Sequence, residues 1–221
     1  MYLTRFEINT ERRGARALLS SAHKLHGAVE HCFPTTAEAA ESVGRVLWRL
    51  DQDHKTALLY LVSPGRPDLT HLVEQAGWPA IQQGWTTRDY TPLLDRLATG
   101  QRWAFRLTAN PVSSRRKTDD STRTQRFGHV TVAQQTAWLL DRTERLGFVV
   151  PKGTNDELDV VVCRRETLRF DRNGHTVTLA TAMFQGLLDI IDPVALRHTL
   201  VQGVGSGKSY GCGLLTLAPV G

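Results

Sequence analysis

The order of the hydrophobic periods along the first 110 residues is the feature that most restricts the fold. Apolar residues alternate in a half-buried strand, whereas in a helix they recur every three or four positions. These periods predict a strand at residues 2–8, a helix at 13–33, strands at 45–50 and 55–63, helices at 69–76 and 91–98, and a strand at 103–109. The order β, α, β, β, α, β is that of a ferredoxin-like unit, in which two helices cover one face of a four-stranded antiparallel sheet.

The second half carries the start and stop signals of two further helices. Thr131 and Gln134 have the spacing of a capping box, and the helix that they begin is expected to end at Gly147. Asp192 and Pro193 have the order of an N-cap followed by a proline in the first turn, so they predict the start of the second helix.

Five strand patterns surround these helices. Asn173-Gly174 is a strong signal for a tight hairpin turn. The expected strands lie at residues 160–164, 167–170, 175–181, 184–191 and 214–217. We therefore predict an α+β fold with tandem ferredoxin-like (RRM-like, βαββαβ) domains, at residues 1–112 and 129–221.

The segment between these domains, residues 113–128, differs in composition. Residues 111–127 contain five basic side chains, many turn-forming residues and no regular period. We interpret the segment as a mobile basic linker. Arg115, Arg116 and Lys117 could bind an anionic partner or could belong to a solvated surface loop, because runs of charge are usually solvated.

A glycine-rich stretch, residues 203–213, joins the last predicted helix to the last predicted strand. Its five glycines allow positive φ and leave backbone N–H groups uncovered, as in a phosphate-binding loop. The candidate phosphate-binding residues are Gly205, Gly207, Lys208 and Ser209. A glycine-rich turn that only lets helix and strand pack closely is an equal alternative.

This stretch does not have the pattern of a nucleotide-binding P-loop. That motif needs a glycine five residues before its Gly-Lys pair, and the residue there is Gln202. A P-loop also follows a strand and begins a helix, whereas this stretch has the opposite order. The sequence therefore disfavours a nucleotide triphosphatase.

The composition is that of a soluble globular protein with a basic excess. Lys and Arg number 27 against 22 Asp and Glu, which favours an anionic partner such as nucleic acid without requiring one. Cys32, Cys163 and Cys212 are far apart and lack zinc-site or disulfide spacing, which fits a reducing compartment. The sequence shows neither a signal peptide nor a membrane span, so we expect no membrane association and a cytoplasmic location.

His23 and His26 lie three residues apart on the predicted helix at residues 13–33, with Glu30 one turn further on. They could ligate a metal, although no second cluster supplies further ligands. They could equally be structural. The third interpretation is acid–base catalysis on RNA, because the ribose 2′-OH can attack its own phosphate and a histidine titrates near neutrality.

Five blocks spread over the chain point to one known family. They are MYLT from Met1, HKLH from His23, FRLTANP from Phe105, QTAWL from Gln135 and GVGSGKSYGCGLLTLAP from Gly203. In these blocks the chain resembles the CasE family of CRISPR RNA-processing endoribonucleases, within the RAMP superfamily.

The resemblance implies both an activity and partners. A protein of this kind binds the stem-loop RNA of a CRISPR repeat and cuts it at the 3′ base of the stem, with no metal or other cofactor. It then stays on the mature guide RNA with other subunits of the Cascade complex, and the free protein is expected to be a monomer. His26 matches the catalytic histidine of the family, and His23, where the family often has tyrosine, is the second catalytic candidate.

The resemblance also implies where RNA would bind. Arg169 and Arg172 match a basic hairpin that approaches the stem, and Arg115, Arg116 and Lys117 match a basic segment near the duplex. Basic side chains suit duplex RNA, because its deep and narrow major groove offers mainly phosphates.

Two alternatives to the endoribonuclease hypothesis remain. The first is a non-catalytic RNA-binding subunit of a guide-RNA complex, in which His23 and His26 are structural. The second, a nucleotide-binding protein, is disfavoured by Gln202.

Overall fold

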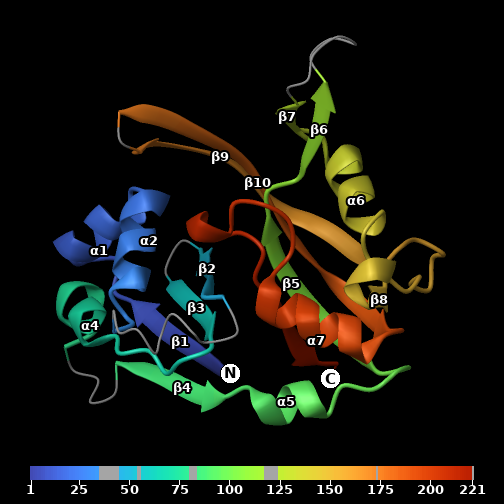
Figure 1. The fold of residues 1–221 in the computed structure, drawn as a ribbon, viewed down its shortest axis with the longest axis horizontal. Helices are drawn as coiled ribbons and strands as arrows, with labels where there is room; N and C mark the ends of the chain where they lie inside the picture. Colours follow the sequence, from blue (N-terminus) through green and yellow to red (C-terminus); the bar gives the residue numbers. More distant parts are fainter. Residues whose placement is uncertain (35–44, 54–55, 80–83, 117–123, 173, 221) are drawn as a thin grey trace.

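Two antiparallel sheets, one from each half of the chain, organise the fold. The computed structural model describes residues 1–34, 45–53, 56–79, 84–116, 124–172 and 174–220. A four-stranded sheet lies on the left of Figure 1 and a five-stranded sheet on the right. Within the described ranges, no helix combines the length and the apolar character needed to cross a lipid bilayer.

The first sheet has its strands in the order β2-β3-β1-β4, with all pairings antiparallel. Its strands are β1 (Tyr2–Ile8), β2 (Leu47–Gln52), β3 (Ala57–Ser63) and β4 (Trp85–Asp89). Phe6 and Leu59 are buried against the helices α1 (Arg13–Leu19), α2 (Ala22–Glu30) and α4 (Thr70–Ala76). Leu3 and Val62 alternate to the other face and pack into a core shared with the second half of the chain. Both faces of this sheet are therefore covered.

The helix predicted at residues 13–33 is in fact two helices, α1 and α2. The backbone of Ser21 is extended, with φ −153° and ψ 123°, and the Ser20 hydroxyl donates to the carbonyl of Ala17. Serine side chains compete for backbone hydrogen bonds in this way and interrupt helices. The predicted apolar stripe persists across the break, since Leu18 and Leu25 are both buried.

The fourth strand of the first sheet is β4, which was not predicted. Its residues Thr86 and Arg88 are exposed, so the segment lacks a strong hydrophobic signal. The strand predicted at 103–109 is β5 (Arg102–Ala109), and it pairs with β10 (His175–Ile190) and β11 (Leu215–Pro219) in the second sheet. Its assignment to a first domain at residues 1–112 is therefore wrong, because a strand pattern does not say which strand is the neighbour.

With β5 as its first strand, the second half is also ferredoxin-like. The strand order is β11-β5-β10-β8, and β9 pairs along β10 as well. The remaining elements are β8 (Phe148–Val149), β9 (Val160–Arg172), α6 (Val132–Leu140) and α7 (Pro193–Gln202), while α5 (Thr91–Asp95) connects the two sheets and is shorter than predicted. The tandem ferredoxin-like class is confirmed.

Both helix starts predicted for the second half are confirmed. The Thr131 hydroxyl accepts from the Gln134 N–H in a complete capping box, and the Asp192 carboxylate accepts from two N–H groups of α7. α6 ends before the predicted Gly147. A 3-10 turn, η1 (Glu144–Leu146), follows it, and Gly147 closes that turn with φ 91°.

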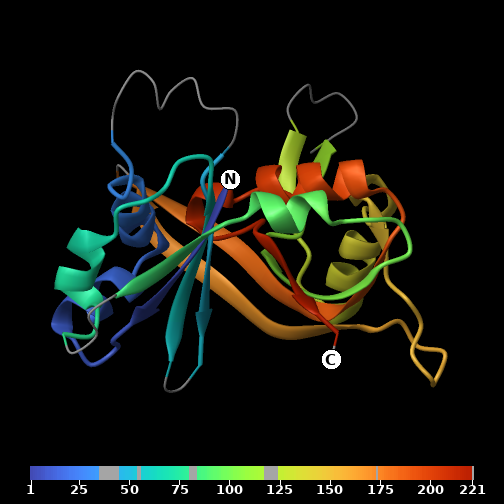
Figure 2. The same cartoon turned by 90° about the horizontal axis from the view of Figure 1, so that it is seen from below.

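β9 and β10 form one long hairpin. The strands predicted at 160–164 and 167–170 are a single strand, as are those at 175–181 and 184–191. Gly174 has φ 77° at the turn, and Asn173 lies outside the described residues. Figure 2 shows the hairpin running without interruption from the second sheet towards α2, which it contacts.

The predicted linker at residues 113–128 contains regular structure. β6 (Val112–Arg116) and β7 (Thr124–Gly128) pair antiparallel, so an irregular linker is the wrong description of these two segments. Residues 117–123 between them lie outside the described residues.

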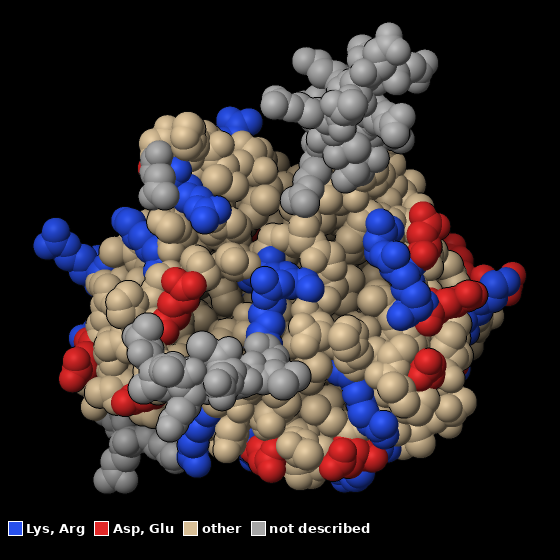
Figure 3. Space-filling view, viewed as in Figure 1, with Lys and Arg blue, Asp and Glu red and all other residues tan. Residues whose placement is uncertain are grey.

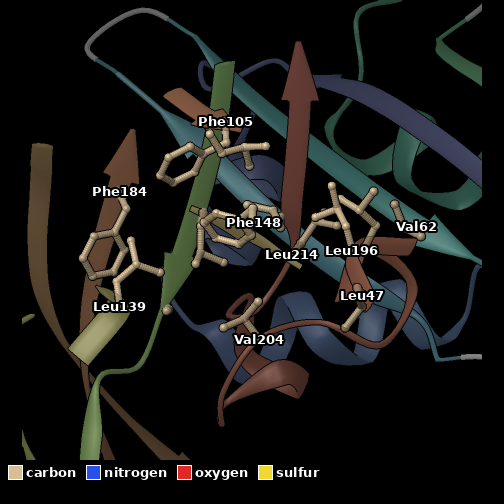
Figure 4. Packing of buried hydrophobic residues seen from close by; sticks show 14 of the residues in the cluster. Leu47, Val62, Phe105, Leu139, Phe148, Phe184, Leu196, Val204 and Leu214 are labelled. Atoms are coloured by element: carbon tan, nitrogen blue, oxygen red, sulfur yellow. The ribbon is translucent and has the colours of Figure 1, made fainter. Parts of the chain in front are cut away.

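The main core joins the two halves of the chain. Figure 4 shows Phe105, Phe148 and Phe184 of the second sheet in one apolar layer with Leu196 of α7, and that layer continues to Leu47 of the first sheet. Burial of this apolar layer resists separation of the two units.

A buried charge cluster also crosses this junction. Arg49 of β2 is 2% exposed and donates from Nε and one terminal nitrogen to the two carboxylate oxygens of Asp51, at 2.7 and 3.0 Å. The other terminal nitrogen donates to the backbone oxygens of Arg106 and Leu214, on the far side of the junction. Arg106 of β5 also donates to Asp51, at 2.9 Å.

The surroundings of Asp51 stabilise its ionised form. Burial opposes ionisation, but hydrogen bonds and charges from Arg49, and then from Arg106, outweigh it and hold the pKa of Asp51 below its ordinary value.

We expect Asp51→Asn to lower the free energy of unfolding at pH 7 by about 3–5 kcal/mol, because Arg49 would remain as a buried charge with no ionised partner. Since the folded pKa of Asp51 is depressed, its contribution is present above about pH 4 and is lost as the pH falls through the folded pKa. Denaturant titrations from pH 7 to pH 3 should therefore show the difference between wild type and variant shrinking as the pH falls.

Asp189→Asn is the matched control, because Asp189 pairs with Arg102 at a more exposed position. Its cost should be about 1 kcal/mol or less. Equal losses for the two variants would contradict a special role for the cluster.

Candidate functional site

α2 presents His26 at the rim of the first core. Leu25 and Val29 of this helix are buried, which fixes how the helix packs, and His26 lies beside them with 23% of its side chain exposed. His23, one turn earlier, is half-buried. Its Nδ1 is buried with no hydrogen-bond partner among the described residues.

Two side chains contact the imidazole of His26. Its Nε2 lies 3.2 Å from Oε1 of Glu30, and the two form an ion pair when the imidazole is protonated. On another side the ring meets Tyr210 edge to face, with centroids 5.9 Å apart and an interplanar angle of 70°. The glycine-rich stretch therefore approaches α2 at the candidate catalytic histidine.

A groove runs past His26. It lies between the end of α2, the start of β2 and the glycine-rich stretch. Its polar and aromatic lining residues are His26, Glu30, His31, Phe33, Arg45, Trp48 and Ser209. An imidazole, a guanidinium and a hydroxyl in one groove can exchange a proton with a bound anion and stabilise its charge.

The glycine-rich stretch is a tightly packed turn. Its glycines 203, 205, 207, 211 and 213 all have positive φ. A Cβ on Gly211 would lie 2.6 Å from Cζ3 of Trp48, and one on Gly213 would lie 2.8 Å from the carbonyl oxygen of Val204. The alternative that these glycines permit close packing therefore has direct support at two positions.

The predicted phosphate-binding residues are placed differently from one another. Ser209 is exposed and lines the His26 groove, and Gly205 is also exposed. Lys208 turns inwards, where its Nζ donates to the carbonyl of Gln202 at 2.6 Å. Burial and then the charge of Arg45 hold the pKa of Lys208 below its ordinary value. Lys208 thus closes the end of α7 and places its charge near Arg45.

The β9–β10 hairpin crosses above this site (Figure 1). Arg169 and Arg172 on β9 are exposed, whereas Phe170 between them is 8% exposed. The Phe170 ring packs on Tyr210, with centroids 4.6 Å apart. The structure therefore connects the predicted basic hairpin to His26 through Tyr210.

The other predicted basic residues lie elsewhere. Arg115 and Arg116 belong to β6, which projects away from α2 in both ribbon views (Figures 1 and 2), and Lys117 lies outside the described residues. On the face shown in Figure 3, basic side chains occur at the centre, on the left and on the right, and acidic ones lie on the left, at the bottom and on the right. This face therefore offers basic groups on several elements.

Three residues of the site were not identified from the sequence. Tyr210, Arg45 and Trp48 were absent from the prediction, and Glu30 was considered only as a metal ligand. Within the described part of the chain, no three His, Cys, Asp or Glu side chains are grouped as metal ligands would be. The HKLH block identifies α2, but the approach of Tyr210 to His26 depends on tertiary packing, which leaves no local signal in the sequence.

Comparison with known proteins gives a consistent result over the whole chain. A family model described as CRISPR associated protein matches residues 1–219. The chain is 28% identical over 227 residues to the CRISPR-associated endoribonuclease Cse3 of Thermus thermophilus, covering 99% of this chain and 100% of that protein. It is 27% identical over 227 residues to the CRISPR system Cascade subunit CasE of Escherichia coli K12, covering 100% of both.

A solved structure is similar over the same extent. The structure of CRISPR endoribonuclease Cse3 bound to a 19-nucleotide RNA matches with a TM-score of 0.77 and 28% identity, covering 99% of this chain and 100% of that one. The similarity spans both ferredoxin-like units.

Gly211→Ala tests whether packing requires the glycine-rich turn. We expect a loss of at least about 1–2 kcal/mol in the free energy of unfolding, because the left-handed backbone disfavours a Cβ and Trp48 occupies its place. Gly65→Ala is the control, since a Cβ there would meet no atom within 4 Å. Thermal unfolding of both variants measures the difference, and similar melting temperatures would show that the turn tolerates a side chain.

Proposed function

Because the chain belongs to the CRISPR-associated protein family, whose model matches residues 1–219, we propose that it is a metal-independent endoribonuclease that processes CRISPR precursor RNA. It cleaves the repeat stem-loop at the 3′ base of the stem. The observation that carries the proposal is the position of His26, which lines a groove directly beside the element that connects to the basic hairpin.

The reaction uses a nucleophile that the RNA itself provides. The 2′ oxygen attacks the adjacent phosphorus, and the bond from phosphorus to the 5′ oxygen of the next nucleotide breaks. The products are a 2′,3′-cyclic phosphate and a free 5′-hydroxyl. One proton must leave the 2′-OH and one must reach the 5′ oxygen, and His26 supplies either general base or general acid catalysis.

The surroundings of His26 suit this chemistry. Arg45 and Ser209 line the same groove and can donate to the phosphate oxygens as negative charge develops. Glu30 lies 3.2 Å from Nε2 and can hold the imidazole at the edge of the groove. His23 is the weaker catalytic candidate, because its Nδ1 is buried and cannot contact a phosphate in this arrangement.

The stem is proposed to bind along the β9–β10 hairpin. Arg169 and Arg172 are exposed there, on the strand whose Phe170 packs on Tyr210 beside His26. The exposed Gly205 and Ser209 and the partly exposed Gly207 contact the phosphates near the cut, and the charge of Lys208 acts from behind the loop. Arg115, Arg116 and Lys117 are proposed to supply further contacts to the RNA.

The cleaved guide RNA is proposed to stay bound, with the protein joining other Cascade subunits. The similar protein of Escherichia coli is named a Cascade subunit, and the match covers its full length. The rival function is a non-catalytic RNA-binding subunit, for which the groove would only hold RNA.

We expect His26→Ala to lower the single-turnover rate of cleavage by about 100- to 10,000-fold while the affinity for the stem-loop stays within about twofold, because the role of His26 is proton transfer. The assay uses a labelled repeat stem-loop from the same genome in EDTA. His198→Ala, at an exposed histidine of α7, is the matched control. Binding without cleavage by the wild type would favour the non-catalytic subunit, and cleavage by both proteins would move the catalytic role away from His26.

Replacing both Arg169 and Arg172 with alanine should weaken stem-loop binding and reduce the slope of log affinity against log salt by about 1–2, because each phosphate contact releases a counterion. Arg88→Ala, at an exposed arginine of β4, should leave the slope unchanged. A slope that is the same in all three proteins would remove the hairpin from the interface.

A further inference from the structure

Tyr210 lies between the catalytic candidate and the basic hairpin. Its ring meets His26 on one side, with centroids 5.9 Å apart, and Phe170 on the other, with centroids 4.6 Å apart. These three rings come from α2, the glycine-rich turn and β9, which are far apart in the sequence. Tyr210 thus contacts both His26 and Phe170.

The backbone holds Tyr210 firmly in this position. Its N–H donates to the carbonyl of Gly207 at 2.8 Å, and the glycines on either side of the short helix η2 (Lys208–Tyr210) have φ of 78° and 81°. Gly211 lies against the indole of Trp48, so the turn cannot shift towards β2. The ring therefore extends from a rigid base.

Contacts within α2 restrain the His26 side chain only weakly. It lies at the rim of the core, and its partner on α2, Glu30, has 67% of its side chain exposed. An exposed carboxylate on a flexible side chain restricts an imidazole weakly. The edge-to-face contact with Tyr210 is thus the firmer restraint on the orientation of the ring.

Phe170 extends this restraint to the hairpin. It is 8% exposed, and its neighbour Arg169 is exposed to solvent on the same strand. RNA bound to the hairpin would therefore act on a strand that packs, through Phe170, on Tyr210. Displacement of the hairpin changes the contact that orients His26.

We propose that Tyr210 is a positioning residue that holds the His26 imidazole in its productive orientation and couples that orientation to the hairpin through Phe170. This inference rests on the proposed endoribonuclease function. The role belongs to the aromatic ring of Tyr210, because both contacts are made by the ring.

The test compares Tyr210→Phe, Tyr210→Leu, Phe170→Leu and the double variant Tyr210→Leu/Phe170→Leu in single-turnover cleavage and in stem-loop binding. Tyr210→Leu should slow cleavage about 10- to 100-fold, because a small misplacement of a catalytic group is enough for such a loss. Its affinity should stay within about twofold of wild type, and Tyr210→Phe should restore the rate to within about threefold. The double variant should be no slower than the slower single variant, since both changes break one series of contacts.

Tyr2→Leu is the control for loss of a half-buried tyrosine elsewhere, on β1. Thermal unfolding of each variant shows that it remains folded. A normal rate in Tyr210→Leu would overturn the inference. Equal losses in Tyr210→Leu and Tyr210→Phe would also overturn it, because they would assign the effect to the hydroxyl, and multiplicative losses in the double variant would remove the coupling.

A second readout separates this inference from the proposed function. In the RNA-free protein, the NMR signals of the His26 ring should shift in Tyr210→Leu and should stay close to their wild-type positions in Tyr210→Phe, because an aromatic neighbour displaces them. This measurement holds even if the wild type cleaves no RNA. Unchanged His26 signals in Tyr210→Leu would refute the positioning role by itself.

Discussion

The arrangement of the two ferredoxin-like units depends on one buried arginine. Arg49 extends from the first sheet and is saturated by the Asp51 carboxylate together with backbone oxygens of β5 and of the residue before β11. A guanidinium at this depth is tolerated only while its donors are satisfied, so the two sheets must stay in register. The apolar layer around Leu47 and Val62 holds the two units together without fixing their orientation, and the directional hydrogen bonds of Arg49 fix that orientation.

The candidate groove beside His26 is a consequence of that register. Neither unit alone contains it, because His26 comes from a helix of the first unit and Ser209 and Tyr210 come from the last connection of the second. Gly211 lies against Trp48 of β2, so the turn is seated on the first sheet. The position of His26 relative to Ser209 and Tyr210 is therefore determined by the interface between the two units.

The sequence predicted secondary structure well, but it predicted strand pairing and tertiary contacts poorly. Hydrophobic periods and caps located most helices and strands, and the HKLH block indicated His26 as the catalytic candidate. The pattern of β5 was recognised, but its partner β10 follows much later in the chain, and no local signal records that pairing. Arg49 lay inside an apolar strand pattern, and apart from Asp51 its partners lie on distant segments, so no local signal indicated its burial. The contact of Tyr210 with His26 was not predicted either, because turns have no period from which a buried face can be inferred.

β10 is one continuous strand whose two parts have different pairing partners. Residues 182–189 of this strand pair with β5 in the sheet, while residues 175–181 pair only with β9 in the projecting hairpin. Adding or removing residue pairs near the turn would therefore change the length of the projection by about 6–7 Å for every two residues per strand and leave the sheet intact. Under the proposed function, the length of this projection sets how far from the cleavage site the hairpin can contact an RNA stem, independently of the packing of the core.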